Sequence, residues 1–460
     1  MQQTISPVDG RVYVERPLGS ARDIELTLAA AVRAQSDWRQ LGIAGRCALL
    51  SRAVDAFVAD GDAIASEITW QMGRPVSQTP GEIRGFEERS RYMLSIAAEA
   101  LAPIQPPRTA GFERWLERAP LGLIAAIAPW NYPYLTAVNA VIPALAAGNV
   151  VVLKHSHQTP LCAERLAAAF TAGGLPPGVF QYLHLSHDDT SHFIADPRVN
   201  FVCFTGSVSG GHAVQRALSA GFADSGLELG GKDPAYVRAD ADLPQAIDVV
   251  TDGAFFNSGQ SCCGIERVYV DDKVYDEFVA GVVGQVRKYR LGIPTDPATT
   301  LGPMVRASAA AFVREQITEA VRSGARALID PGTFPADQAG TPYLAPQVLV
   351  DVDHSMRIMT EETFGPAVGI MRVRSDREAL RLMNDSEYGL TAALFTRDID
   401  LARQLGAQIE TGTVFLNRCD YLDPALAWTG VKNSGRGCTL SRVGYEHLTR
   451  PKSFHFRLPA

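Results

Sequence analysis

Two adjacent cysteines, Cys262 and Cys263, lie in a glycine-containing stretch at residues 255–267. The residues before them are expected to form a helix, and those after them alternate as a strand does. A thiol in a turn between helix and strand is accessible to a substrate, and its thiolate is a strong nucleophile. A cysteine taken alone is more often a small buried apolar residue, so the rest of the sequence must decide.

A first block of alternating strands and helices occupies residues 123–204. A helix is expected at residues 160–172, with Thr159 as its N-cap and Pro160 in its first turn. Apolar strands are expected at residues 123–128, 150–153, 179–183 and 201–204. This alternation indicates a doubly wound parallel sheet, whose ligand crevice lies at the carboxyl ends of the strands and usually holds a nucleotide.

A second α/β block extends over residues 233–417. Its strands are expected at residues 267–270, 367–371 and 413–416, and its helices at residues 243–256, 273–288 and 308–324. Ahead of both blocks, residues 20–92 are predicted to be helical, with Ser20 as the N-cap of the first helix. The sequence therefore predicts an α/β fold with two domains.

Two more strands are predicted outside both blocks, at residues 112–118 and 452–458. The Pro-rich passage at residues 102–107 ends the helical region before the first of them. Because proteins usually cover unpaired strand edges, these strands indicate an oligomerisation arm.

Composition narrows the classes of partner. The chain has 460 residues and a net charge of −7. Because it also lacks a dense Lys/Arg cluster, it has no positively charged surface that would attract nucleic acid or an anionic membrane. Its seven cysteines include no CxxC pair, and His155 and His157 have no companion ligands, so neither disulfides nor a metal site is expected. Without a signal-like start or a long apolar run, we expect a cytoplasmic protein with a small-molecule substrate.

Four motifs occur together in this chain. They are Pro-Trp-Asn-Tyr-Pro at 129–133, Glu-Leu-Gly-Gly-Lys at 228–232, Asn-x-Gly-Gln-x-Cys at 257–262 and Glu-Glu-Thr-Phe-Gly-Pro at 361–366. By these motifs, their order and the interval from Glu228 to Cys262, the chain resembles the aldehyde dehydrogenase superfamily over nearly its whole length.

The resemblance implies an aldehyde dehydrogenase-like α/β fold, with two doubly wound α/β domains plus a small β oligomerisation arm. Residues 1–101 and 121–230 would form the Rossmann-like dinucleotide-binding domain, and residues 231–433 the catalytic domain with the nucleophilic cysteine. Residues 102–120 and 434–460 would form the arm, which would close a homodimer or a homotetramer.

The implied reaction oxidises an aldehyde to the carboxylic acid and transfers hydride to NAD(P). Cys262 would add to the carbonyl to give a thiohemiacetal, whose oxyanion Asn131 and the Cys262 N–H would stabilise. Glu228 would activate the water that hydrolyses the thioester, with a pKa raised by burial. Acylating relatives that use coenzyme A generally lack this glutamate, so hydrolysis is expected. Taken alone, a glutamate such as Glu228 is more commonly a solvated charge at a strand end, and Asn131 has the alternative interpretation of a turn residue before Tyr-Pro.

The expected cofactor residues surround a turn at residues 204–211, where a pyrophosphate can approach a helix N-terminus. The resemblance implies Trp130, Lys154, His157, Gly206, Ser207, Gly211, Leu229, Gly230, Glu362 and Phe364. Strictly NAD-dependent members tend to have a glutamate where this chain has His157, so we expect NADP to be accepted as well as NAD. Residues 183–187 also depart from the family, since many members have a glycine there near the adenine.

The substrate tunnel is expected to be mostly aromatic and neutral. By the same resemblance its lining comprises Tyr132, Thr136, Asn139, Ser261, Tyr421 and Trp428. This lining favours a medium-sized apolar or aromatic aldehyde. The nearby cation Arg418 leaves open an aldehyde with an ω-carboxylate, such as succinic semialdehyde.

Two other classes of protein remain open. A cysteine hydrolase would use the same thiol, but no histidine is placed as its base and the nucleotide-binding block would be unexplained. A catalytically silent dinucleotide-binding protein is expected to have lost Cys262 or Glu228, and both are present.

Overall fold

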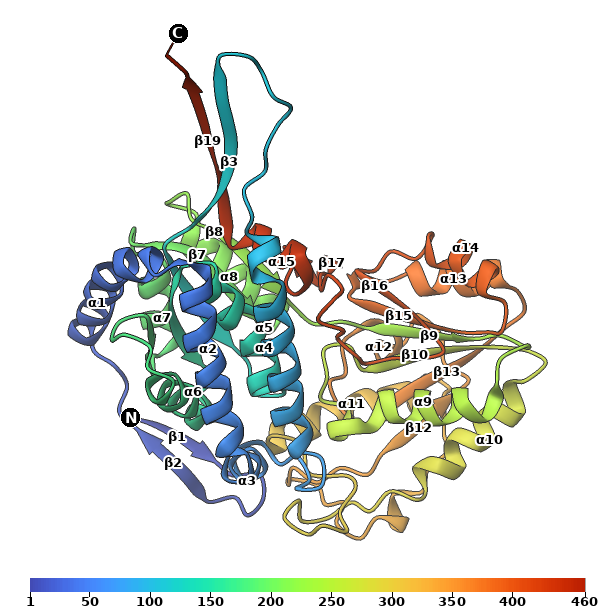
Figure 1. The fold of residues 1–460 in the computed structure, drawn as a ribbon. Helices are drawn as coiled ribbons and strands as arrows, with labels where there is room; N and C mark the ends of the chain where they lie inside the picture. Colours follow the sequence, from blue (N-terminus) through green and yellow to red (C-terminus); the bar gives the residue numbers. More distant parts are fainter. Residues whose placement is uncertain (460) are drawn as a thin grey trace.

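Two largely parallel sheets, each packed against helices, make up most of the molecule, and a two-stranded arm extends from one side (Figure 1). The computed structural model describes residues 1–459. The first sheet has the strand order β18-β8-β7-β4-β5-β6, and the second the order β11-β12-β13-β10-β9-β15-β16. In both, the chain starts near the middle and adds strands to each side, which is the doubly wound arrangement predicted from the sequence.

The first sheet is parallel except for its edge strand β18, which runs antiparallel to β8. Its strands β4 and β5 are almost wholly buried, as expected for a parallel sheet covered on both faces. The strands are β4 (Leu123–Ala128), β5 (Val150–His155), β6 (Phe180–Tyr182), β7 (Val199–Thr205), β8 (Asp224–Glu228) and β18 (Gly435–Arg436). The intervening helices are α5 (Pro133–Ala146), α6 (Pro160–Ala172), α7 (His187–Ile194) and α8 (Val208–Leu218).

The N-terminal region is helical, as predicted, after a short hairpin of β1 (Gln2–Ile5) and β2 (Val12–Arg16). Its helices are α1 (Ala21–Gln40), α2 (Gly42–Ala59), α3 (Gly61–Met72) and α4 (Pro80–Ala100). Ser20 caps α1 as expected, in a reciprocal capping box with Asp23. Thr159 is the N-cap residue of α6 and Pro160 lies in its first turn, as predicted. The Thr159 hydroxyl makes no capping hydrogen bond, however, and lies 3.0 Å from Nδ1 of the buried His155.

The second sheet is parallel except for the edge strand β11. Its strands are β9 (Asp233–Val237), β10 (Ile265–Asp271), β11 (Arg326–Ala327), β12 (Gln347–Val350), β13 (Ala367–Val373), β15 (Thr391–Phe395) and β16 (Thr413–Leu416). Its helices are α9 (Leu243–Phe255), α10 (Tyr275–Val286), α11 (Ala307–Arg322), α12 (Arg357–Thr360), α13 (Asp376–Asn384) and α14 (Ile399–Gly406), with the 3-10 turns η1 (Phe256–Gly259) and η2 (Pro331–Thr333).

The arm consists of β3 (Phe112–Pro120) and β19 (Thr449–Arg457), which pair antiparallel and project away from the sheets (Figure 1). Trp115 stacks on Phe454 across the pair, with ring centroids 4.4 Å apart. The last elements are the pair β14 (Tyr388–Gly389) and β17 (Val431–Lys432), and helix α15 (Ser441–His447) before β19. Among residues 1–459, no helix is both long enough and apolar enough to cross a membrane.

Candidate active site

Cys262 lies in a turn between η1 and β10, and the backbone ahead of it is left-handed. Asn257 and Ser258 have φ values of 53° and 56°. Such conformations cost roughly 1–3 kcal/mol for residues other than glycine, so the surroundings must hold them. Ser258 Oγ donates to Gly302 O at 2.8 Å, and Asn257 Nδ2 donates to Gln260 O at 3.3 Å. These hydrogen bonds fix the turn that presents the thiol.

The two adjacent thiols differ in environment. Cys262 is half-buried, whereas Cys263 is buried and its Sγ donates to Asp420 Oδ1 at 2.9 Å. The Cys262 thiol, burial and the Asp420 carboxylate together raise the pKa of Cys263. A thiol in this environment stays protonated and therefore a poor nucleophile, which leaves Cys262 as the candidate.

Glu228 ends strand β8 and faces the same space as Cys262. Its Oε2 accepts a hydrogen bond from Thr205 Oγ1 at 2.9 Å, and its Oε1 accepts one from the Thr439 hydroxyl. Burial raises the pKa of Glu228, and the two hydroxyls and the Arg89 charge oppose that rise. A carboxylate with a raised pKa is suited to general-base catalysis near neutral pH.

A cavity of about 400 Å³ brings Cys262 and Glu228 together. All six residues expected to form the substrate tunnel border it, namely Tyr132, Thr136, Asn139, Ser261, Tyr421 and Trp428. Asn131 is buried beneath the turn, and its Nδ2 donates to Gln260 O at 3.2 Å. The structure therefore gathers Cys262, Glu228 and the predicted substrate residues around one space, while Asn131 contacts the nucleophile turn without bordering the cavity.

Arg74 and Glu82 form a buried ion pair in the wall of the cavity. Arg74 Nη1 lies 2.6 Å from Glu82 Oε2, and both side chains are at most 2% exposed. Arg74 also donates to the Asn131 carbonyl and, through Nε, to Asn257 Oδ1 at 3.2 Å. Glu82 Oε1 accepts two backbone N–H groups in the first turn of α5, each at 2.9 Å. The pair therefore joins α4, α5 and the segment after α3 to the nucleophile turn.

Arg89, on α4, brings a second guanidinium to the cavity wall. Its Nη1 donates to Leu135 O at 2.6 Å and to Asn139 Oδ1 at 3.1 Å. No carboxylate among residues 1–459 forms an ion pair with it. Burial lowers the pKa of Arg89, and Glu82 is the strongest of the carboxylates that oppose this. Because an unpaired buried charge is costly, an anionic group on a ligand would stabilise this side chain.

Arg418, the cation suggested by the sequence, is exposed and stacks on the Tyr421 ring, 3.6 Å from its centroid. It is therefore engaged at the surface rather than in the cavity.

A second cleft, of about 470 Å³, contains four of the predicted cofactor residues. They are Trp130, Ser207, Glu362 and Phe364. Glu362 Oε1 accepts the Gly231 N–H at 3.0 Å, and burial together with the Glu266 charge raises the pKa of Glu362 to about 8. A Cβ on Gly230 would collide with the Glu362 carboxylate, so glycine is required there.

The turn after β7 packs closely on its own strand and on the next one. A Cβ on Gly206 would lie 2.7 Å from the Phe204 ring, and one on Gly211 would lie 3.0 Å from Leu229. Ser207 caps α8 by accepting the Gly210 N–H at 3.2 Å. These contacts bring the N-terminus of α8 close to the ends of the strands, where a pyrophosphate can approach it.

Lys154 and His157 lie at and just after the end of β5. Lys154 is buried, which lowers its pKa, and no carboxylate among residues 1–459 pairs with it. Burial lowers the pKa of His157, and so do the positive charges of Lys154, His187 and Arg306. Basic side chains without a carboxylate partner do not repel a phosphorylated ribose, and together with the α8 turn these residues fit a dinucleotide.

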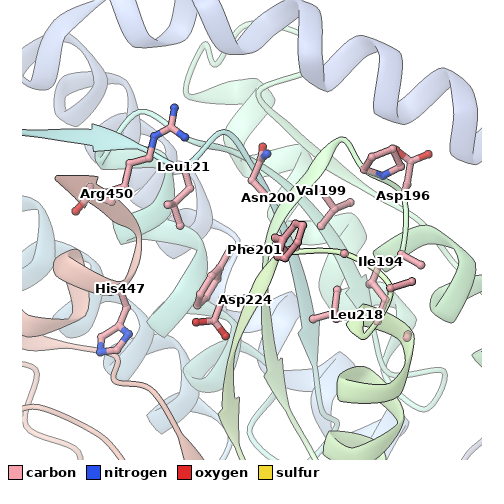
Figure 2. A pocket seen from close by; sticks show the side chains of 18 of the residues that line it. Leu121, Ile194, Asp196, Val199, Asn200, Phe201, Leu218, Asp224, His447 and Arg450 are labelled. Carbon is pink, nitrogen blue, oxygen red and sulfur yellow. The ribbon is translucent and has the colours of Figure 1, made fainter. Parts of the chain in front are cut away.

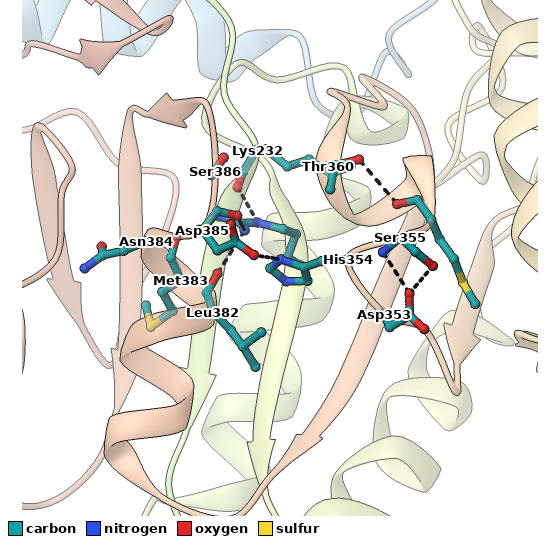
Figure 3. Close-up of polar contacts among 12 residues, drawn as sticks. Lys232, Asp353, His354, Ser355, Thr360, Leu382, Met383, Asn384, Asp385 and Ser386 are labelled. Atoms are coloured by element: carbon teal, nitrogen blue, oxygen red, sulfur yellow. Dashed lines mark hydrogen bonds and ion pairs between the residues drawn. The ribbon is translucent and has the colours of Figure 1, made fainter.

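Figure 3 shows the polar network that anchors the segment before Glu361. His354 Nδ1 lies 2.7 Å from Asp385 Oδ2, and its Nε2 lies 2.9 Å from the Tyr269 hydroxyl. Beyond this segment, Lys232 Nζ lies 2.6 Å from Glu266, which also accepts the backbone N–H groups of residues 363 and 364. The two networks hold the Glu362 loop against the second sheet.

Sequence reasoning missed Arg74, Glu82, Arg89 and Asp420. Each is a charged residue outside the recognised motifs, and its importance comes from long-range contacts that no local pattern reveals. Only Asp420 could have been suspected from the sequence, because it lies within three residues of both Arg418 and Tyr421, which are expected near the substrate.

The molecule has two doubly wound sheets, a half-buried thiol that faces a glutamate, and a separate cleft suited to a nucleotide. This combination is typical of dinucleotide-dependent oxidoreductases that use a cysteine nucleophile. Residues 1–454 match the model of the aldehyde dehydrogenase family, and the chain belongs to that family. It is an NAD(P)-dependent oxidoreductase that acts on an aldehyde group.

Several relatives of this chain are succinate semialdehyde dehydrogenases. The chain is 34% identical to succinate semialdehyde dehydrogenase [NAD(P)+] Sad of Escherichia coli over 96% of this chain and 95% of that one. It is also 34% identical to succinate-semialdehyde dehydrogenase [NADP(+)] of Deinococcus radiodurans, over 98% and 93% of the two chains. The structure of succinic semialdehyde dehydrogenase from Streptococcus pyogenes with NADP+ has a TM-score of 0.94 and 30% identity, covering 99% of this chain and 100% of that one.

Proposed function

We propose that this protein oxidises a short aldehyde that carries a carboxylate at its other end, such as succinic semialdehyde, to the dicarboxylic acid. The observation that supports it is that Cys262, Glu228 and the unpaired Arg89 border one cavity. The semialdehyde names of the relatives agree with this chemistry.

The Cys262 thiolate adds to the aldehyde carbon, and the carbonyl oxygen becomes an oxyanion. The Cys262 N–H and the second N–H of the Asn131 amide, whose first is bound to Gln260 O, stabilise that charge. When bound, the dinucleotide supplies the hydride acceptor, and Trp130, Lys154, His157, Ser207, Glu362 and Phe364 hold it.

Loss of hydride leaves the acyl group on Cys262 as a thioester. Glu228 takes a proton from a water as that water attacks the thioester carbon, and the acid leaves while the thiolate is restored. Arg89 holds the distal carboxylate of the substrate and so fixes the distance between that group and the reacting carbon.

The test replaces Arg89 with Gln. We expect the KM for succinic semialdehyde to rise by roughly tenfold or more, since a hydrogen bond to a charged group contributes about 1.5–3 kcal/mol. The KM for hexanal should change little, and Arg89→Lys should recover part of the loss. Arg418→Gln is the matched control, because that guanidinium stacks at the surface.

A second substrate class is supported by the aromatic part of the cavity wall, which includes Tyr132, Phe256, Tyr421 and Trp428. Such a wall suits a medium-sized apolar or aromatic aldehyde. If the wild-type protein turns over benzaldehyde and hexanal with much higher kcat/KM than succinic semialdehyde, this second class replaces the first.

A further inference from the structure

A small cavity of about 30 Å³ is bordered by Glu228 but not by Cys262. Glu228, Thr136 and Thr205 border both this cavity and the substrate cavity, so the base stands between the two spaces. His447 borders the small cavity as well. A space of this size has room for a water molecule, provided that polar groups surround it.

The small cavity has such polar groups. Besides Glu228 and His447, its wall includes the hydroxyls of Thr205 and Thr439 and the thiol of Cys438. Thr205 and Thr439 already hydrogen-bond to the two oxygens of Glu228. A continuous series of groups that can donate or accept a proton therefore extends from the base into the cavity.

His447 ends helix α15 and is exposed, so it contacts solvent as well as the cavity. It also borders a surface pocket of about 890 Å³ at the base of the arm. Figure 2 shows His447 among the side chains that line this pocket. The imidazole thus has the buried cavity on one side and open solvent on the other.

The charged groups around His447 come from several elements. They are Asp224 on β8, Arg436 on β18, Asp196 before β7, Glu446 on α15 and Arg450 on β19. Arg436 pairs with Asp224 at 2.8 Å. The thiols of Cys203 and Cys438 are the titratable groups on the inner side.

The chemistry creates a need for such a route, and this step rests on the proposed function. Each hydrolysis adds a proton to Glu228, which must lose it before the next turnover. The substrate cavity holds the departing acid at that moment. A separate exit for the proton would let the base recover without waiting for product release.

We propose that the proton leaves Glu228 through one water in the small cavity to His447, which passes it to solvent. Glu228 gives up its O–H proton to the water, the water gives a proton to the imidazole, and the imidazolium releases one to bulk water. His447 is a relay residue that acts through Glu228, and it touches neither substrate nor cofactor.

The experiment compares His447→Gln with the wild-type protein and with His192→Gln, which changes an exposed histidine on α7. Stopped-flow absorbance of the reduced cofactor measures the first turnover, and rapid quenching measures decay of the acyl-enzyme. We expect an unchanged first turnover and an unchanged first acyl-enzyme decay in His447→Gln, because Glu228 starts ionised. The steady-state rate of cofactor reduction should be about tenfold slower, with an altered pH profile. Added imidazole should restore the rate, and His192→Gln should behave as wild type.

A second variant, Cys203→Leu, fills the small cavity from β7 without changing His447. It should slow steady-state turnover in the same way, and imidazole should not restore the rate. A normal steady-state rate and an unchanged pH profile in His447→Gln would overturn the relay, and so would a defect that imidazole leaves unchanged. Absence of any first turnover in the wild-type protein would instead refute the proposed function.

Discussion

The Glu228 carboxyl is held by two hydroxyls in a site where burial raises its pKa. As a base it works only when ionised, so activity is lost as the pH falls through that raised pKa. We expect the acid limb of acyl-enzyme hydrolysis to lie above the ordinary glutamate value of 4.5. The rate of hydrolysis measured against pH tests this, and a limb at or below that value would contradict it.

Replacing Glu228 with Gln removes the base but keeps the size of the side chain. We expect one equivalent of reduced cofactor per Cys262 in a rapid burst, followed by turnover at least about a hundredfold slower than wild type. Burst amplitude and steady-state rate are both read from the reduced-cofactor absorbance. Cys263→Ala is the comparison variant and should keep most of the activity, because that thiol is protonated and bound to Asp420.

At the scale of elements, the Arg74 and Glu82 pair joins α4, α5 and the segment after α3 to the nucleophile turn. Glu82→Gln leaves a buried guanidinium without its counter-charge. We expect the free energy of unfolding to fall by about 3–5 kcal/mol, measured by urea denaturation. The control Asp400→Asn breaks an exposed pair with Arg403 and should change it by less than about 1 kcal/mol. An equal decrease in the free energy of unfolding in the two variants would show that the buried pair stabilises the protein no more than an exposed pair does.

The α/β alternation could be predicted from the sequence because buried parallel strands are apolar runs and the helices between them are amphipathic. Ser20 was also predictable, since a capping box is a local interaction. The N-cap position of Thr159 was predictable too, but the partner of its hydroxyl was not, because a buried imidazole competes for it.

The motif residues of the site could be located by resemblance, whereas Arg89 could not. Its significance depends on α4 packing beside α5, which places the guanidinium next to Asn139. That packing is a contact between residues fifty positions apart, and spacing within a helix gives no sign of it.

At the scale of the whole molecule, the arm exposes apolar side chains on a pair of strands that lies outside both sheets. Phe112 and Phe456 are 36% and 48% exposed. We propose that a second copy of the chain covers this surface. Deleting residues 450–460 removes most of β19, and we expect the protein to become monomeric by light scattering while the wild type is a dimer or a tetramer. A monomeric wild type would refute the proposal.

The cavity wall draws on residues from Arg74 to Trp428, from strands of the first sheet and from helix and loop segments beside the second sheet. Neither half of the chain therefore contains an active site of its own, and a reactive thiol exists only after the two halves have docked. On heating, enzyme activity should disappear before the helical circular dichroism does, because a small shift between the halves separates Cys262 from Glu228 while each sheet is still intact. Activity is thus a more sensitive indicator of correct assembly in this protein than its secondary structure.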